Sequence, residues 1–169
     1  MKEVKGIEKL TEILQKFVEK FGCDIEIGEE FSYYYDDALI NYSLIIPVFS
    51  DKVWKEYVLK TFNYKIKNIF MFSLLHEIGH HMTYDLYTEK DCKKEDETIK
   101  KIEKALACST SYATDKNLNL AYFNLPMEKT ATKWAVRYYK THSLEMELLW
   151  RKFKRELKKF YKINGLKDN

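Results

Sequence analysis

The chain has few of the residues that interrupt or crosslink regular structure. Its 169 residues include two prolines, five glycines and three cysteines. So few helix and strand breakers predict long elements with few interruptions. Cys23, Cys92 and Cys108 are odd in number and far apart, with no C-x-x-C pair. This pattern argues against a disulfide framework or a thiolate zinc knuckle and indicates a reducing compartment.

Long hydrophobic runs are also lacking. The first 21 residues carry charges every few positions and have no uninterrupted apolar region of the kind found in signal peptides. No later stretch approaches the length of a membrane span. We therefore expect a cytoplasmic protein with no membrane partner.

No charge of one sign dominates, and several enzyme motifs are missing. The net charge of +3 comes from 29 basic and 26 acidic residues, which neither demands nor excludes a nucleic-acid partner. There is no glycine-rich phosphate loop and no nucleophile elbow, so enzyme classes built on these motifs have no support.

What is present predicts one α+β domain, predominantly helical, over residues 1–169. The length suits a single core, and 46% hydrophobic residues with 33% charged residues indicate a globular chain. Apolar periodicity predicts helices over 4–21, 52–62 (capped by Asp51), 66–84, the later part of 89–115, 125–142 and about 143–163. Three or so strands are expected within 23–50, in "CDIEIG", "FSYYYDD" and "ALINYSLIIPVFS".

The predicted helix over 66–84 ends in a possible metal site. His76, Glu77 and His80 form H-E-x-x-H. Positions i and i+4 of a helix differ by about 40° and share one face, so both imidazoles can reach one ion. His81 lies roughly 140° from His76 and is left out of the ligand set. Glu77 is placed to meet a zinc-bound water and to accept its proton as general base, which suits amide hydrolysis.

A catalytic zinc also needs a third protein ligand and an open position. The metzincin continuation is absent, since Thr83 and Leu86 stand at its glycine and histidine positions, and His142 is the only other histidine. Cys23 precedes the motif, as a ligand cysteine does in peptide deformylase, but the other motifs of that family are missing. The remaining candidates are downstream carboxylates: Asp85, Glu89, Glu95, Glu97, Glu103, Asp115 and Glu128.

Glu128 is the favoured third ligand. Ala131, Thr132 and Ala135 lie on its own helical face, and such small residues would let two helices approach closely. Gly79, inside the H-E-x-x-H helix, likewise predicts close approach of another element. The acidic residues of 89–103 lie among lysines and are expected to form a solvated surface. The alternative for the motif itself is a helix whose histidines are merely hydrogen-bonded in the core.

"HEIGHH" followed by "LPMEKTATKWA" resembles the ImmA/IrrE family of small gluzincin-type metallopeptidases. The resemblance implies a zincin-like fold, Zn2+ bound by His76, His80 and Glu128, and Glu77 as the catalytic glutamate. Ala131, Trp134 and Ala135 match packing positions of its second motif. It also implies a regulatory peptidase, of a kind often carried by phages or mobile elements, that acts on a specific protein such as a DNA-binding repressor. The interval between the motifs is longer than expected of the family, and Thr132 replaces a common asparagine.

Further expectations concern the surroundings of the site. The strand "ALINYSLII" is the candidate edge for an extended substrate. Tyr138, Tyr139 and His142 are candidates for assisting the oxyanion. The basic helix over 143–163 could bind nucleic acid or an acidic partner, although a solvated face over a core stripe is the favoured interpretation. The alternative function is a non-catalytic zinc-containing regulator that binds DNA or a protein.

Overall fold

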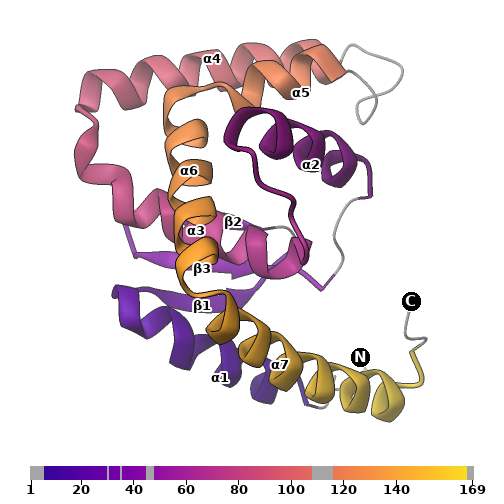
Figure 1. Ribbon diagram of the computed structural model, residues 1–169. Helices are drawn as coiled ribbons and strands as arrows, with labels where there is room; N and C mark the ends of the chain where they lie inside the picture. Colours follow the sequence, from indigo (N-terminus) through magenta and orange to yellow (C-terminus); the bar gives the residue numbers. More distant parts are fainter. Residues whose placement is uncertain (1–5, 30, 35, 45–47, 108–115, 167–169) are drawn as a thin grey trace.

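The computed structural model describes residues 6–29, 31–34, 36–44, 48–107 and 116–166 (Figure 1). Within them it is mostly helical with one small sheet, which confirms the α+β prediction. In order, the elements are α1 (Ile7–Val18), the 3-10 turn η1 (Glu19–Phe21), β1 (Asp24–Ile27), β2 (Ser32–Tyr34), β3 (Leu39–Tyr42), α2 (Val48–Phe62), α3 (Ile69–Thr83), the 3-10 turn η2 (Tyr84–Leu86), α4 (Glu89–Ala107), α5 (Lys116–Phe123), α6 (Pro126–Thr141) and α7 (Ser143–Asn164).

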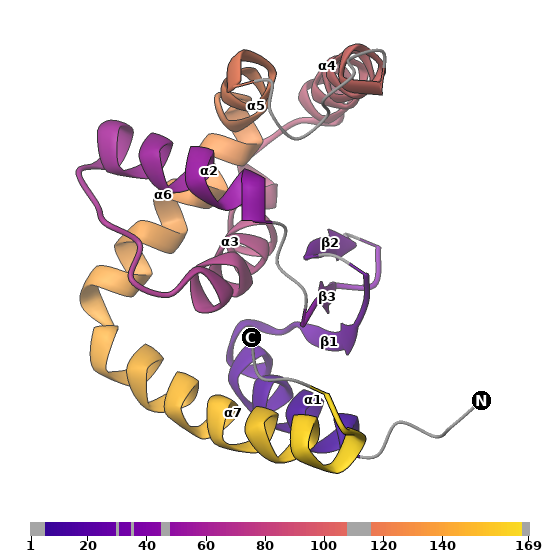
Figure 2. The same cartoon turned by 90° about the vertical axis from the view of Figure 1, so that its right-hand side faces the viewer.

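The sheet has the strand order β1-β3-β2. β1 runs parallel to β3, with Ile25 paired to Ile40, and β2 runs antiparallel to β3, with Tyr33 paired to Ile40. Helix α1 packs against β1, while α3 packs against β2 and β3. Figure 2 shows α3 beside the sheet and α1 next to β1. The sheet therefore supports α3 from one side and places β2 at an edge.

Helices α3 and α6 form the most extensive helix–helix contact of the described chain. Every residue of α3 from Phe70 to Gly79 is buried. A Cβ on Gly79 would lie 2.6 Å from the carbonyl oxygen of Ala131 on α6, closer than any real side chain could come. This confirms the close approach predicted from Gly79, and Ala131, Thr132 and Ala135 are buried as expected.

Two predicted boundaries are wrong, and one helix was missed. The strand predicted through residue 50 ends at Tyr42, because its partners in the sheet are only three or four residues long and offer no longer ladder; residues 45–47 of that prediction lie outside the described residues. Asp51, predicted as a cap, lies inside α2, which already begins at Val48. Helix α5 had no sequence prediction because its asparagine-containing segment lacks a clear apolar period.

The terminal helices follow the sequence closely. Gly22 and Gly165 take left-handed conformations at helix ends, as the sequence predicts for Gly22 after the first helix and Gly165 after the last. The stripe of α7 is partly core, with Met146, Phe153 and Phe160 buried. Of the described helices, none combines the length and apolar character needed to cross a membrane.

Candidate metal site

Three side chains from two helices converge at the centre of the molecule. His76 and His80 come from α3, and Glu128 comes from the first turn of α6. Nε2 of His76 lies 3.0 Å from Oε2 of Glu128 and 3.2 Å from Nε2 of His80. Nε2 of His80 lies 3.4 Å from Oε1 of Glu128. One ligand atom from each residue thus lies within 4.8 Å of the others, which is the arrangement that could hold a metal ion.

The helix packing explains why these groups meet. Imidazoles four residues apart project from the same face of α3. Glu128 lies one turn before Ala131, the residue whose backbone touches Gly79, so the close crossing places its carboxylate against both rings. Pro126 occupies the first turn of α6, where its missing N–H costs no hydrogen bond. The sequence prediction of Glu128 therefore agrees with the observed geometry.

The three groups interact strongly. Burial would lower the pKa of His80, but its hydrogen bond to Glu128 and the charge of that carboxylate outweigh burial and raise the pKa to about 9. For Glu128, burial would raise the pKa, yet the hydrogen bonds and charges of His76 and His80 hold it well below its ordinary value. Glu128 is therefore a carboxylate that strongly favours a cationic neighbour.

Other side chains hold the three groups in place, and none was predicted to do so. The hydroxyl of Thr132 lies 3.1 Å from Nδ1 of His76. The Tyr122 hydroxyl, from α5, donates to Oε1 of Glu128 at 2.9 Å. The ring of Trp54, from α2, lies edge-on to His76 with 5.1 Å between centroids. Thr132 carried one usable signal, because it lies one turn after Glu128 on the same face.

Glu95 corrects the expectation that the acidic residues of 89–103 form a solvated surface. Its side chain, on α4, is buried, and both carboxylate oxygens accept from the backbone N–H of Met127, at 3.0 and 3.2 Å. It therefore satisfies an N–H in the first turn of α6, next to Glu128. Burial is the main cause that raises the pKa of Glu95. The surrounding lysines hid this role, since nothing local marks an acidic residue that caps a distant helix.

The convergence opens into a cleft of about 600 Å³. Glu77 is buried and lines this cleft beside His76 and His80. Its negative charge contributes to the raised pKa of His80, which indicates that the carboxylate is close to the metal-binding groups. The remaining lining comes mainly from β2, α4 and α5: Phe31, Ser32, Tyr33, Tyr84, Cys92, Glu95, Asp96, Ile99, Ile102, Asn119, Tyr122 and Met127.

Other predicted candidates lie elsewhere. His81 is 2.7 Å from the Tyr33 hydroxyl through Nδ1 and is outside the convergent group, as predicted. Tyr138, Tyr139 and His142 are not among the residues that line the cleft, so the structure gives no support to their suggested help to the oxyanion. They lie about three to four turns beyond Glu128. Tyr138 donates to Glu145 and stacks on His142, and Tyr139 packs against Tyr64.

The other candidate ligands that the structure describes lie away from the convergent group. Cys23 is buried away from the cleft, and burial raises its pKa to about 11. Asp85, Glu89 and Glu97 are exposed. The side chain of Glu103 and all of Asp115 lie outside the described residues.

The edge proposed for an extended substrate was assigned to the wrong strand. β3, formed by the "LINY" part of "ALINYSLII", is the central strand, hydrogen-bonded on both sides. The strand at the cleft is β2, whose Ser32 and Tyr33 line it. The alternating pattern of β3 is that of a core strand, with Ile40 and Tyr42 buried.

Comparison with protein-family models, curated proteins and solved structures gave no match for this chain.

Proposed function

We propose that this chain is a zinc-dependent peptidase in which His76, His80 and Glu128 hold the ion and Glu77 is the general base. The proposal rests on the convergence of both imidazole Nε2 atoms, 3.2 Å apart, with the Glu128 carboxylate, which has one oxygen 3.0 Å from His76 and the other 3.4 Å from His80. Ligands about 2.0–2.1 Å from a tetrahedral zinc lie about 3.3 Å from one another, which is close to the 3.2 Å between the two Nε2 atoms and to the distance from each of them to the carboxylate. The donor set of two imidazoles and a carboxylate is also one that catalytic zinc uses.

Three protein ligands leave a fourth position, and the cleft supports its use by a reactant. Structural zinc sites close all four positions with protein groups, whereas catalytic sites keep one for water or substrate. Among the described residues, the convergent group contains three ligands and borders a cleft of about 600 Å³. This arrangement favours a peptidase over the alternative of a non-catalytic zinc-containing regulator.

Each residue then has a stated task. Zinc, when bound, would lower the pKa of a water towards 7 and polarise the scissile carbonyl. Glu77 accepts the proton of the attacking water and delivers it to the leaving amine as the C–N bond breaks. The Thr132 hydroxyl accepts a hydrogen bond from Nδ1–H of His76, which leaves Nε2 for the ion. The edge of β2 pairs with an extended substrate, so that backbone hydrogen bonds position the peptide across the cleft.

The substrate class follows from the resemblance to ImmA/IrrE peptidases. That family implies a regulatory enzyme directed at one or a few proteins, such as a DNA-binding repressor, in the cytoplasm. The zincin-like arrangement is supported by the order of elements: an N-terminal helix, a small sheet, the H-E-x-x-H helix and a later glutamate helix.

Metal analysis joined to a Glu77→Gln variant tests the proposal. Protein purified without chelators should contain about one zinc per chain. It should cleave members of an unstructured peptide library, with products read by mass spectrometry. Glu77→Gln should keep the zinc and lose cleavage by at least about 100-fold, which is the typical contribution of general base catalysis.

The exposed Glu97→Gln on α4 is the matched control and should change neither quantity. Absence of stoichiometric zinc in the wild-type protein would refute the proposal. Stoichiometric zinc with cleavage unaffected by Glu77→Gln would refute the role of Glu77. Zinc without any cleavage would favour the regulator.

A further inference from the structure

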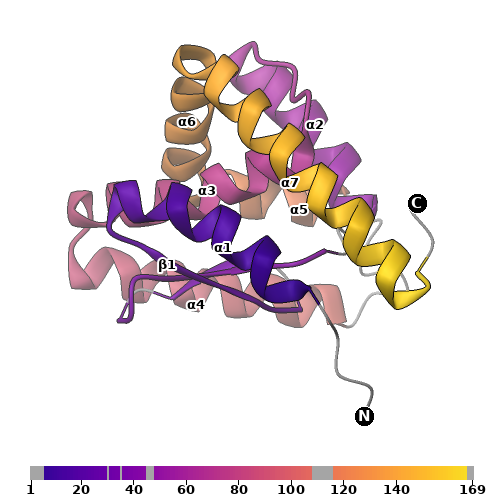
Figure 3. The same cartoon turned by 90° about the horizontal axis from the view of Figure 1, so that it is seen from below.

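A groove runs along the surface between α1 and α7, separate from the metal-site cleft. It consists of two hollows of about 470 and 370 Å³ that share Ile13, Lys16 and Lys152 among their lining residues. Figure 3 shows both helices lying side by side on this face of the molecule. We call this feature the α1–α7 groove.

The two helices run antiparallel along the groove. Lys20, just after α1, forms an ion pair with Glu145 in the first turn of α7. At the other end, a Cβ on Gly6 would lie 3.9 Å from the ring of Phe160. The start of α7 therefore faces the end of α1, and each end of the groove has its own set of side chains.

One end of the groove is apolar. Leu144 and Leu148, one turn apart on α7, are 67% and 55% exposed. Ile13 and Phe17 of α1 are buried and line the hollow beside them. Exposed leucines at the rim of a hollow with an apolar lining are a signature of interaction surfaces.

The other end is basic. Lys152, Arg155 and Lys159 continue the same face of α7 at helical spacing, and Lys9 faces them from α1. Across the whole groove, six lysines and arginines line the two hollows with three glutamates. Each glutamate already contacts a lysine: Glu12 with Lys16, Glu145 with Lys20, and Glu156 with Lys159. The groove thus has a surplus of positive charge.

We propose that the α1–α7 groove binds a helix of a partner protein. The face of this helix that meets the groove is apolar at one end and acidic at the other. The stretch from Leu144 to Lys159 spans about 22 Å at 1.5 Å per residue, which matches a helix of about 15 residues. Apolar residues of the partner cover the leucines, and its carboxylates meet the basic end. This binding does not depend on the proposed peptidase activity.

The combination of apolar and basic ends selects this partner over others. A nucleic acid would use the basic end through its phosphates but would gain nothing from Leu144 and Leu148. A helix with an apolar end and an acidic end would contact both ends of the groove at once.

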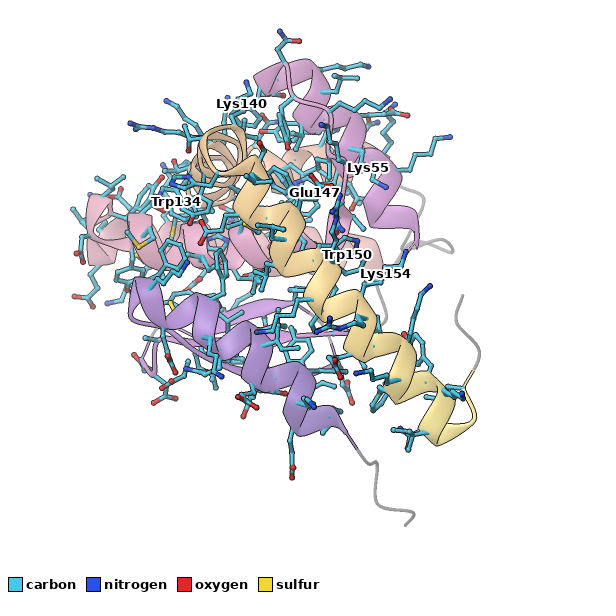
Figure 4. All side chains as sticks on the ribbon, turned by 60° about the horizontal axis from the view of Figure 1, so that its bottom comes forward. Lys55, Trp134, Lys140, Glu147, Trp150 and Lys154 are labelled. Atoms are coloured by element: carbon cyan, nitrogen blue, oxygen red, sulfur yellow. The ribbon has the colours of Figure 1, made fainter. Side chains whose placement is uncertain are left out.

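The far side of α7 supplies matched controls. Figure 4 shows Glu147, Trp150 and Lys154 on the side of α7 that faces α2, away from α1. None of the three lines the α1–α7 groove. Lys154 therefore matches Lys152 in helix and charge while lying outside the groove. Leu59 on α2, 47% exposed, serves in the same way for Leu148.

The test is binding of a labelled synthetic helix of about 16 residues, with leucines in one half and glutamates in the other. Fluorescence anisotropy with the full chain should give a Kd of about 1–100 µM that weakens as salt is added. Leu148→Glu and Lys152→Glu should each weaken binding about tenfold. Leu59→Glu and Lys154→Glu should stay within about twofold, and circular dichroism should confirm that every variant is folded.

A second measurement does not depend on the variants. A photo-reactive group in the leucine half of the peptide should crosslink wild-type protein at the start of α7 or the end of α1. Crosslinking elsewhere, no binding up to about 1 mM, or equal binding of a peptide with lysines in place of glutamates would each overturn the proposal. So would binding of duplex DNA or anionic vesicles that is tighter than peptide binding and indifferent to Leu148→Glu.

Discussion

The two walls of the metal-site cleft are built in opposite ways. One wall is the α3–α6 pair, where Gly79 and Ala131 touch through backbone atoms and all three candidate ligands are held. The other wall is α4, which packs chiefly on α5 through a small separate cluster around Ile102 and Leu125. Precise positions for an ion require the first kind of wall. The part of the cleft that holds no ligand tolerates the second.

The largest expected effect on zinc affinity comes from replacing Glu128, the candidate ligand from α6 that meets the two histidines of α3. Glu128→Gln keeps the shape of the side chain but removes the charge that a divalent cation needs. Zinc affinity should fall more than about 100-fold, beyond the 10–100-fold typical of residues that only support a ligand. Competition with a chromogenic chelator measures it. A fall no larger than that of Glu97→Gln would show that Glu128 is not a ligand.

The close helix crossing predicts the next effect. Gly79→Ala would place a Cβ 2.6 Å from a backbone oxygen of Ala131, which no change of rotamer can relieve. In an ordinary helix this substitution stabilises by about 1 kcal/mol. Here the free energy of unfolding should fall by about 2–3 kcal/mol. Urea denaturation decides between the two signs, and Ala131→Gly should not rescue the variant because the contacting atoms belong to the backbone.

Removing the Thr132 hydroxyl, which contacts His76, should have a smaller effect. Thr132→Val removes the partner of Nδ1 while keeping the volume and branching of the side chain. Zinc affinity should weaken about tenfold, as for other residues that orient a ligand. Thr132→Ser, which keeps the hydroxyl, is the control and should stay close to wild type. Equal losses in both variants would point to packing instead of the hydrogen bond.

A substitution in α4, the second wall of the cleft, should have the smallest effect. Ile102→Ala should lower the local opening free energy of α4 and α5 by about 1 kcal/mol, less than in a main core because few buried partners surround it. Faster amide hydrogen exchange confined to α4 and α5 would show this. Zinc affinity should stay within about twofold. A fall in zinc affinity as large as that of Thr132→Val would erase the distinction between the walls.

The features that the sequence could predict are those set by the spacing of residues along one helix. His76, His80 and Gly79 follow from helical periodicity, and Glu128 follows from the small residues on its own helix, so these rest on local spacing. Glu95 acts across a separation of 32 residues to Met127, and Tyr122, although only six residues from Glu128, reaches it from a different helix. No local pattern marks such partners.

The end of the third strand was mispredicted for a related reason. The branched residues after Tyr42 favour extended structure, but a strand also needs partners, and β1 and β2 offer only short ones. Sheet length is a property of the assembled neighbours. The helices, whose hydrogen bonds are internal, were correspondingly easier to predict.

The separation of the ligands along the chain has a consequence for folding. His76 and Glu128 are 52 residues apart, and the segment between them contains α4 and α5. An ion bound by both residues would crosslink the two ends of this long loop, and the crosslink would be lost when the ion is removed. The entropy of closing a loop rises only slowly with its length, by about 0.6 kcal/mol for each doubling. Insertions between the two motifs would therefore add little to the entropy of closing the loop, which is compatible with the long interval between the candidate ligands of this chain.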